Sequence, residues 1–144
     1  MPLPEPEPGL VIQYQFRWSH ESDSAHEERR RRRPCIIIST TKTARETTVT
    51  VAPITTVPPQ YPDEAIEVPQ KVRDHLRLDA VRSWIKFNEL NMFSWPGLYV
   101  FPLPIALGWN KFDYGYLPPK FFEQVKNAIL ALDASRKNLT IRTG

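Results

Sequence analysis

The sequence predicts a mainly β protein, a small barrel or half-barrel of short strands followed by a C-terminal α-helix. Alternating or β-branched apolar stretches recur between residues 10 and 101, whereas helical spacing of apolar residues is pronounced only after residue 118. The chain of 144 residues also contains fifteen prolines, which favour rigid connections between strands over a helical bundle. Several short strands with little helix close most economically into a small barrel.

The first strand is predicted over residues 10–18. Apolar and more polar side chains alternate there in the order Leu-Val-Ile-Gln-Tyr-Gln-Phe-Arg-Trp. Successive side chains of a strand point to opposite faces, so this alternation predicts one buried face. We expect Trp18, at the end of this pattern, and Trp84, in a later strand, to belong to the core.

The other elements are predicted from β-branched or apolar runs for strands and from helical spacing for helices. They are strands over 35–40, 47–56, 65–68, 83–87 and 98–101, and helices over 69–77 and 119–134. The strands over 35–40 and 47–56 form a hairpin. The longer helix starts at Pro118-Pro119, after which Phe122, Val125, Ile129 and Leu132 recur at helical spacing.

The length allows one domain, which we place at residues 9–137. Residues 1–8 are rich in proline and are predicted to be a disordered tail, and residues 138–144 a second tail. No apolar run approaches the roughly 18 residues of a membrane span. The start also lacks the basic and apolar regions of a secretory signal, so we expect a cytoplasmic protein.

Positive charge is concentrated in one place. The net charge is +3, and five of the nineteen basic residues form the run Arg29–Arg33; the remaining fourteen are outnumbered by sixteen acidic residues. The run ends a polar stretch over 19–33, and loops of this length are usually functional or disordered. It indicates a local patch for an acidic partner, although a solvated loop or a nuclear-type address would have the same composition.

Familiar catalytic constellations are missing from the sequence. The five glycines form no phosphate-binding loop, and the three histidines lack metal-ligand spacing, so we expect neither a cofactor nor a metal. The single cysteine, Cys35, lies in an apolar run and is expected to be a buried hydrophobe and not a nucleophile. An active site would have to be built from Arg, Thr, Ser, Glu or His.

Four segments, taken in order and at their spacing, resemble the MazF/PemK toxin family. They are Gly9-Leu10-Val11-Ile12, Arg33-Pro34-Cys35-Ile36-Ile37-Ile38, Val51-Ala52-Pro53-Ile54-Thr55 and Ser83-Trp84-Ile85. In that family a glycine precedes the first strand, an Arg-Pro dipeptide opens the second, a Pro-Ile-Thr ending closes the third, and a serine follows the short helix. The resemblance covers roughly residues 9–134.

The resemblance implies an SH3-like barrel that forms a homodimer and acts as the toxin of a bacterial type II toxin–antitoxin pair. It also implies a PemK-like, metal-independent endoribonuclease that cuts single-stranded RNA and inhibits growth. The family's catalytic arginine matches Arg33, its threonine Thr55 and, more weakly, a loop glutamate Glu28. The cognate antitoxin is expected to be acidic and to fold on docking beside the positive run.

The implied chemistry is reasonable for these residue types. In metal-free RNA cleavage the 2′-hydroxyl attacks the adjacent phosphorus, and negative charge gathers on the phosphoryl oxygens. A guanidinium stabilises that charge with paired donors, and a threonine hydroxyl adds another. An antiparallel hairpin would bring Arg33, at the start of one strand, and Thr55, at the end of the next, to the same edge of the sheet.

RNA binding is assigned to two groups of residues. Arg29, Arg30, Arg31 and Arg32 would contact phosphates, and the loop aromatics Trp109, Tyr114 and Tyr116 would stack on unpaired bases unless they only pack.

The sequence departs from the family pattern in three places. The loop before Arg33 is longer and more charged, Glu89-Leu90-Asn91 replaces a Gln-hydrophobic-Arg triplet, and residues 96–118 have no counterpart. Two alternatives remain: a gyrase-inhibiting toxin of the same fold, although its Trp-Gly-hydrophobic chain end is missing, or a nucleic-acid-binding barrel without catalysis.

Overall fold

The computed structural model describes residues 3–20, 32–78, 80–103 and 111–143. Within them, eight strands form one sheet, accompanied by two α-helices and two short 3-10 helices. The strands are β1 (Leu10–Gln15), β2 (Arg32–Lys42), β3 (Thr47–Thr55), β4 (Ala65–Glu67), β5 (Trp84–Lys86), β6 (Glu89–Ser94), β7 (Asp113–Tyr116) and β8 (Asn138–Ile141). The helices are α1 (Gln70–Leu76), α2 (Pro119–Ala131), η2 (Pro62–Glu64) and η4 (Ala134–Arg136). The predicted mainly β class with a C-terminal helix is confirmed.

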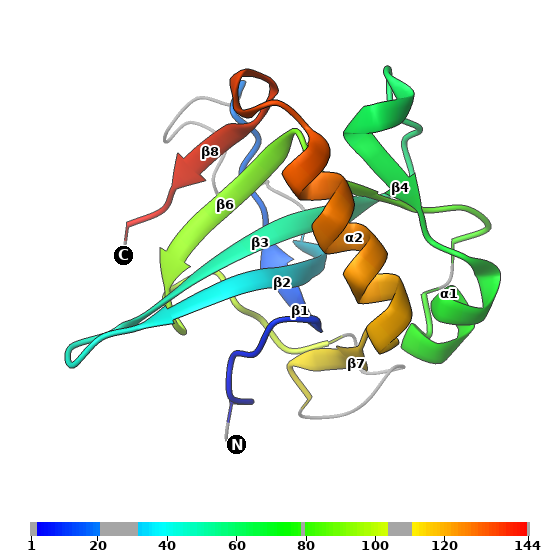
Figure 1. Ribbon diagram of the computed structural model, residues 1–144. Helices are drawn as coiled ribbons and strands as arrows, with labels where there is room; N and C mark the ends of the chain where they lie inside the picture. Colours follow the sequence, from blue (N-terminus) through cyan, green and yellow to red (C-terminus); the bar gives the residue numbers. More distant parts are fainter. Residues whose placement is uncertain (1–2, 21–31, 79, 104–110, 144) are drawn as a thin grey trace.

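The hairpin of β2 and β3 is the long central element of the sheet (Figure 1). Its antiparallel register runs from Cys35 opposite Pro53 to Lys42 opposite Thr47, with an irregularity between Ile37 and Ser39. The structure extends β2 back to Arg32. The predicted loop over 19–33 is therefore wrong at its end, because Arg32 and Arg33 pair with Gln15 and Tyr14 of β1.

The sheet curves because β3 has two partners along one edge. Its first half, Thr48–Val51, pairs with β6, and its last residues, Ile54 and Thr55, pair with β5. Along the main path of the sheet the strands follow the order β4-β5-β3-β2-β1-β7. Outside this path, β6 pairs with β3, and β8 pairs with β6 in parallel orientation. Each end of β3 thus belongs to a different part of the sheet, and the sheet has a barrel-like shape.

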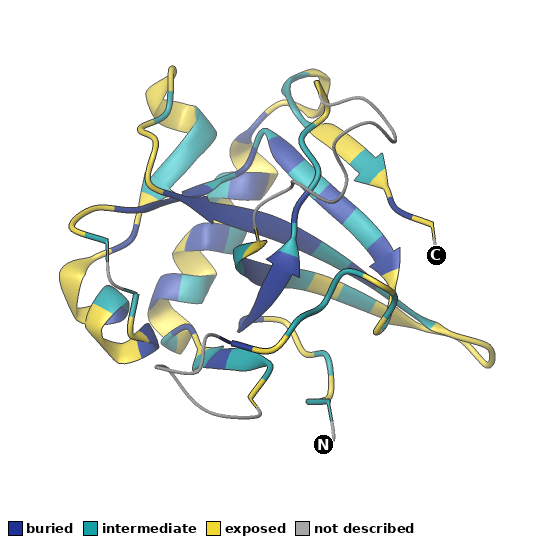
Figure 2. Ribbon diagram, turned by 180° about the vertical axis from the view of Figure 1, so that it is seen from behind, coloured by how far each residue is buried: buried dark blue, intermediate teal, exposed yellow. Residues whose placement is uncertain are grey.

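Two apolar clusters lie on opposite faces of the sheet. One lies beneath α2 and joins Val125 and Ile129 to Val11, Ile36 and Ile54. The other contains Leu10, Ile12 and Tyr14, the alternating residues of β1 that point away from Val11. Both faces of β1 are thus buried (Figure 2), and the predicted single buried face is wrong, because α2 covers the face that carries Val11.

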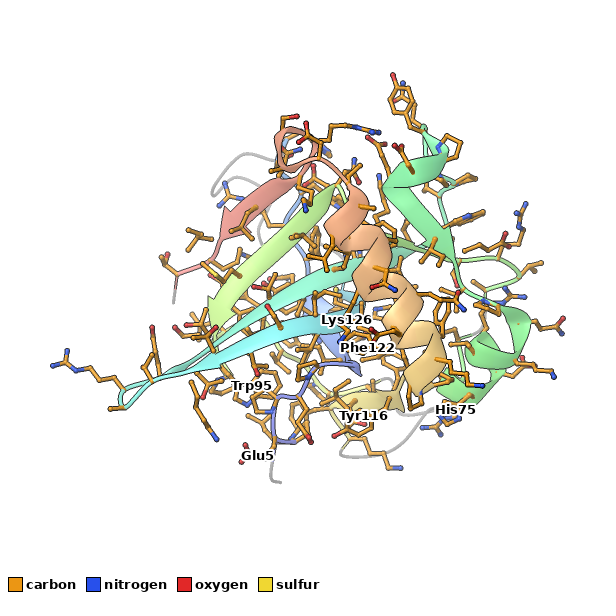
Figure 3. All side chains as sticks on the ribbon, viewed as in Figure 1. Glu5, His75, Trp95, Tyr116, Phe122 and Lys126 are labelled. Carbon is orange, nitrogen blue, oxygen red and sulfur yellow. The ribbon has the colours of Figure 1, made fainter. Side chains whose placement is uncertain are left out.

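Helix α2 lies across the sheet and begins at Pro119, as predicted, but ends at Ala131. Phe121 enters the core with Val125 and Ile129, whereas Phe122 is half-buried against this cluster, next to Lys126 (Figure 3). Gly9 approaches Phe122 with φ of +94°, and an added Cβ would lie 3.7 Å from its ring. Glycine is the residue that adopts this backbone conformation without strain. Gly9 therefore lets the chain that leads into β1 pass close to α2.

Three strands were not predicted. β6 places Glu89, Asn91 and Phe93 inward, and this polar alternation does not have the apolar pattern of a buried strand. β7 lies in the stretch 96–118, and Val100 of the predicted strand over 98–101 makes only a single bridge to Tyr14. β8 covers residues 138–141 of the predicted C-terminal tail, so this part of the tail belongs to the sheet.

The predicted N-terminal tail contacts the domain at Glu7. The Tyr116 hydroxyl donates a hydrogen bond of 2.6 Å to Glu7, and the Leu10 amide donates to the Glu7 carbonyl at 3.1 Å. Tyr116 lies beside this N-terminal segment in Figure 3. Its hydrogen bond to Glu7 raises the pKa of Tyr116 to about 12. These hydrogen bonds connect the end of the predicted tail to the domain.

Candidate functional site

Arg33 and Thr55 lie at the same end of the β2–β3 hairpin. The pairing of β2 with β3 ends with Cys35 opposite Pro53, and two residues further along each strand, on the same face of the sheet, come Arg33 and Thr55. On its other edge, Thr55 pairs with Trp84 of β5. The hairpin therefore brings the two residues of the expected catalytic pair together at one end of the central strands.

Two adjoining cavities share Arg33, Thr55 and Thr56 in their walls. The serine cavity, of about 130 Å³, is completed by Arg32, Pro34, Ile54, Leu78, Ala80 and Ser83. The tryptophan cavity, of about 300 Å³, is completed by Trp18, His20, Val57 and Lys86. Since Arg33 and Thr55 line both, a molecule that extends through the two cavities would contact the pair at their junction.

Thr55 is held in place by the backbone that follows it. Its side chain is buried, and its Oγ1 accepts a hydrogen bond from the Val57 amide at 3.2 Å. A hydroxyl that accepts one hydrogen bond still has its own proton to donate. Thr55 is thus a fixed donor for an oxygen atom bound in either cavity.

Ser83 contributes a second hydroxyl to the serine cavity. It lies between α1 and β5 and is 2% exposed, and its backbone carbonyl accepts a hydrogen bond from Val68. Its Oγ makes no hydrogen bond to any of the described residues. A buried hydroxyl without a partner is costly, so an oxygen-rich ligand in this cavity would satisfy it.

The described walls of the two cavities contain cations and hydroxyls but no carboxylate. Aromatic rings flank two of the cations: the Arg33 guanidinium lies 5.2 Å from the Trp18 ring centroid, and that of Arg32 lies 3.7 Å from the Phe101 centroid. Guanidinium and hydroxyl donors side by side are the groups that bind a phosphate. The site is therefore suited to an anionic, phosphate-bearing ligand.

Metal ligands do not cluster in the described part of the chain, where no group of three or more His, Cys, Asp or Glu residues comes together. Cys35 is fully buried, as predicted, and burial raises the pKa of its thiol well above the usual range. A thiol that stays protonated is a poor nucleophile and a poor metal ligand. Among the described helices, none has the length and apolar character needed to cross a membrane.

β6 fixes the backbone on both sides of Trp18. Asn91 is fully buried; its Nδ2 donates to the Arg17 carbonyl at 2.8 Å, and its Oδ1 accepts from the Arg17 amide at 3.0 Å. Glu89 accepts hydrogen bonds from the amide and the hydroxyl of Ser19 at 2.8 and 2.7 Å. Hydrogen bonds from β6 thus fix the backbone of the residues immediately before and after Trp18.

Removing the Asn91 amide is expected to destabilise the protein by about 2–4 kcal/mol. Besides Arg17, the Oδ1 of Asn91 accepts from Arg142 Nη1 at 3.2 Å and from the Tyr14 hydroxyl at 3.3 Å, so Asn91→Ala breaks a buried network. Urea unfolding measures the loss. Asn127→Ala, at an exposed position of α2, is the matched control and should stay within about 0.5 kcal/mol of the unchanged protein. Equal stabilities of the two variants would contradict the role of Asn91.

The remaining predicted site residues have different outcomes. Glu28, Arg29, Arg30, Arg31 and Trp109 lie outside the described residues. Arg32 lines the serine cavity. The predicted base-stacking role of Tyr114 is wrong, because this residue is 8% exposed in the core beneath α2 and its hydroxyl donates to Gln13 Oε1 at 2.9 Å. Tyr116 is exposed but is bonded to Glu7.

Sequence reasoning missed Trp18, His20 and Lys86 as wall residues. Trp18 packs against the core cluster that contains the residues of β1, as expected, but it is only half-buried and also lines the tryptophan cavity, because it lies beyond β1, which ends at Gln15. Trp84 is buried as predicted. The available signal was Lys86, a charged residue inside an otherwise apolar strand, where a charge faces either solvent or a ligand.

Two other cavities lie away from Arg33 and Thr55, next to η2, and they share Pro62 and Asp63. One is mostly apolar and is also lined by Ile66, Phe87 and Leu132. The charged groups of the other, Asp63 and Arg136, bind each other through contacts of 2.6 and 2.7 Å. These cavities offer no group for catalysis.

Comparison with known proteins gives one match. A family model described as the PemK-like, MazF-like toxin of type II toxin–antitoxin system matches residues 9–132. The comparisons with curated proteins and with solved structures found no match. The matched range contains both cavities and all strands except β8.

Proposed function

Since the chain belongs to the PemK-like, MazF-like family of type II toxin–antitoxin toxins, we propose that it inhibits growth by cutting single-stranded RNA without a metal ion. The observation that carries this proposal is the pair of Arg33 and Thr55 at the junction of two cavities. Their described walls present cations and hydroxyls to a ligand, as a phosphodiester requires. The scissile phosphate would lie between Arg33 and Thr55.

The proposed reaction is an internal transesterification. The 2′-oxygen of one nucleotide attacks the adjacent phosphorus, the bond to the 5′-oxygen breaks, and the products are a 2′,3′-cyclic phosphate and a 5′-hydroxyl. The proton leaves the 2′-hydroxyl for a base, for which the resemblance proposes Glu28, and a proton is delivered to the departing 5′-oxygen. The charges balance without any external oxidant, reductant or activated water.

Arg33 and Thr55 would act on the phosphoryl oxygens. Negative charge grows there in the transition state, and the Arg33 guanidinium is already placed by β2 and the Trp18 ring. Thr55 would donate its hydroxyl proton to the same oxygens while the Val57 amide holds its Oγ1. Donors fixed in advance need little reorganisation, which is the main source of electrostatic catalysis. Ser83 would bind a phosphate oxygen in the serine cavity.

Membership of this family implies an antitoxin partner. We further propose that the antitoxin is acidic, that it covers the positive site, and that the chain works as a homodimer in the cytoplasm, where messenger RNA is available. Charge attraction predicts that the complex forms readily at low salt and weakens as ionic strength rises.

A cleavage assay in EDTA tests the proposed function. The purified chain, freed of antitoxin, is incubated with a long single-stranded RNA, and the fragment ends are identified by mass spectrometry. We expect cleavage with cyclic phosphate and 5′-hydroxyl ends, because the described walls offer hydroxyl and guanidinium donors and not carboxylate ligands for an ion. A gel shift without fragments would instead support a non-catalytic binder. A dependence on Mg²⁺ would contradict the metal-free reaction.

A further inference from the structure

We propose that the tryptophan cavity is a nucleobase subsite in which Trp18 stacks on an unpaired base next to the scissile phosphate while Lys86 binds a flanking phosphate. This inference rests on the proposed function, since it concerns the same RNA. It adds a binding role for Trp18, which the alternation of β1 placed in the core.

Trp18 is a rigid aromatic platform. Phe16, which is 1% exposed, packs edge-on against its ring with the centroids 4.9 Å apart. The hydrogen bonds of Asn91 and Glu89 to the residues before and after it fix the backbone. An indole whose position is fixed loses little conformational freedom when a base stacks on it.

The surroundings of the ring suit a nucleotide better than an apolar side chain. The Lys86 ammonium lies 5.4 Å and the Arg33 guanidinium 5.2 Å from the ring centroid. The His20 ring stacks near the indole, at 24° to it and with the centroids 6.5 Å apart. Cations around an aromatic ring match a planar base carried on a phosphate backbone.

Arg33 links this subsite to the reaction, because it lines both cavities. A phosphate bound between Arg33 and Thr55 has its neighbouring base within the tryptophan cavity. Every base has a π-face, so stacking on Trp18 strengthens binding for any sequence and does not by itself select one. The subsite accordingly explains affinity for unpaired RNA, since a base in a duplex is not free to enter.

The experiment compares Trp18→Leu with the unchanged chain on a single-stranded RNA that carries 2′-O-methyl groups throughout and resists this cleavage. Fluorescence anisotropy should show binding weakened by about 5- to 150-fold, the range for losing one stacked base. Trp18→Phe should retain most of the affinity. Tyr61→Leu, an exposed aromatic residue of another surface, is the matched control and should bind as the unchanged chain does. On cleavable RNA, Trp18→Leu should raise KM by a larger factor than it lowers kcat, because the ring also lies beside the Arg33 guanidinium.

Three controls separate stacking from charge and from misfolding. Polyphosphate, which has no rings, should bind Trp18→Leu and the unchanged chain equally; weaker binding to Trp18→Leu would mean that Trp18 only positions the cations, and would overturn the stacking role. Lys86→Met should lower the slope of log affinity against log salt by about 0.7, as for one lost phosphate contact, whereas Lys42→Met at the far end of β2 should not. Thermal unfolding identifies variants that have not folded. If Trp18→Leu does not fold, the affinity of Trp18→Phe and the salt dependence of Lys86→Met decide whether the subsite exists.

The outcomes distinguish this inference from the proposed function. Cleavage by the unchanged chain with no change of affinity in Trp18→Leu overturns the subsite and leaves the nuclease. Loss of affinity in Trp18→Leu without any cleavage by the unchanged chain supports the subsite and overturns the nuclease. A chain that binds no single-stranded RNA overturns both.

Discussion

Replacing Arg33 by alanine is expected to slow RNA cleavage by about 100- to 1,000-fold, which corresponds to roughly 2.7–4 kcal/mol of transition-state stabilisation. The change removes the guanidinium that lines both cavities together with Thr55. The loss should fall mainly on kcat, because the charge that Arg33 meets is largest in the transition state. Single-turnover rates at saturating protein measure it directly.

Other positions of the basic run are the internal controls for Arg33. Arg31→Ala should act only mildly, since it removes one charge from a run, and so should Arg32→Ala. Arg33→Lys keeps the charge but not the paired donors, so its rate should lie between those of Arg33→Ala and the unchanged chain. If Arg31→Ala and Arg33→Ala behave alike, the run is an electrostatic patch and Arg33 is not catalytic.

The same ranking is expected for toxicity in cells. Arg33→Ala and Thr55→Ala should each abolish growth arrest on expression, because both remove a donor to the scissile phosphate, while both proteins remain folded. Thr55→Ser keeps the hydroxyl and should retain toxicity. Circular dichroism and thermal unfolding of the purified variants exclude the trivial explanation that the substituted chains do not fold.

The parts of the fold that local patterns determine were predictable. The β2–β3 hairpin follows from two β-branched runs separated by a short turn, and α2 follows from apolar residues at helical spacing after Pro118. β8 was not predictable, because its residues Leu139 and Ile141 are exposed and its pairing with β6 joins distant parts of the chain. Pairing of this kind depends on tertiary contacts, which a local pattern does not contain.

Some residues of the candidate site could likewise be predicted from the sequence, and others could not. Arg33 and Thr55 could be identified because the segments around them resemble a family and because a hairpin places them at the same end of its two strands. Trp18 and Lys86 come from segments far apart in the sequence: Lys86 ends β5, which pairs with the end of β3, and its ammonium lies 5.4 Å from the Trp18 ring centroid. The periodicity of β1 predicted a buried Trp18 and contained no sign of this contact.

The departures in β6 have a structural explanation. Glu89 and Asn91 stand where the family commonly has a Gln-hydrophobic-Arg triplet, and both bind the chain as it leaves β1. The buried arginine of this region is Arg142, directly after β8, which donates to the Gln15 carbonyl at 2.8 Å and lies 3.6 Å from the Tyr99 ring centroid. Glu89 and Asn91 thus hold the backbone on either side of Trp18 and do not line either cavity.

A single 2′-deoxy substitution, immediately 5′ of the scissile phosphate, is expected to abolish cleavage while leaving binding nearly unchanged. In the proposed reaction the only nucleophile is the 2′-oxygen of that nucleotide, so its removal leaves nothing to attack the phosphorus. The phosphate contacts of Arg33 and Lys86 and the base contact of Trp18 do not involve this oxygen. The test uses one RNA with a mapped cleavage site and a set of versions with one deoxy position each.

Deoxy substitutions at the other positions should matter little, and this series is the matched control for the first. DNA of the same sequence should bind through its phosphates and resist cutting, and its binding should weaken with salt as that of the RNA does. A nuclease that activates a water molecule would still cut the singly substituted RNA, because water and not the 2′-oxygen would supply the attack. Cutting at that bond would therefore overturn the transesterification mechanism even though the chain would remain a nuclease, and Arg33 and Thr55 would then serve a different nucleophile.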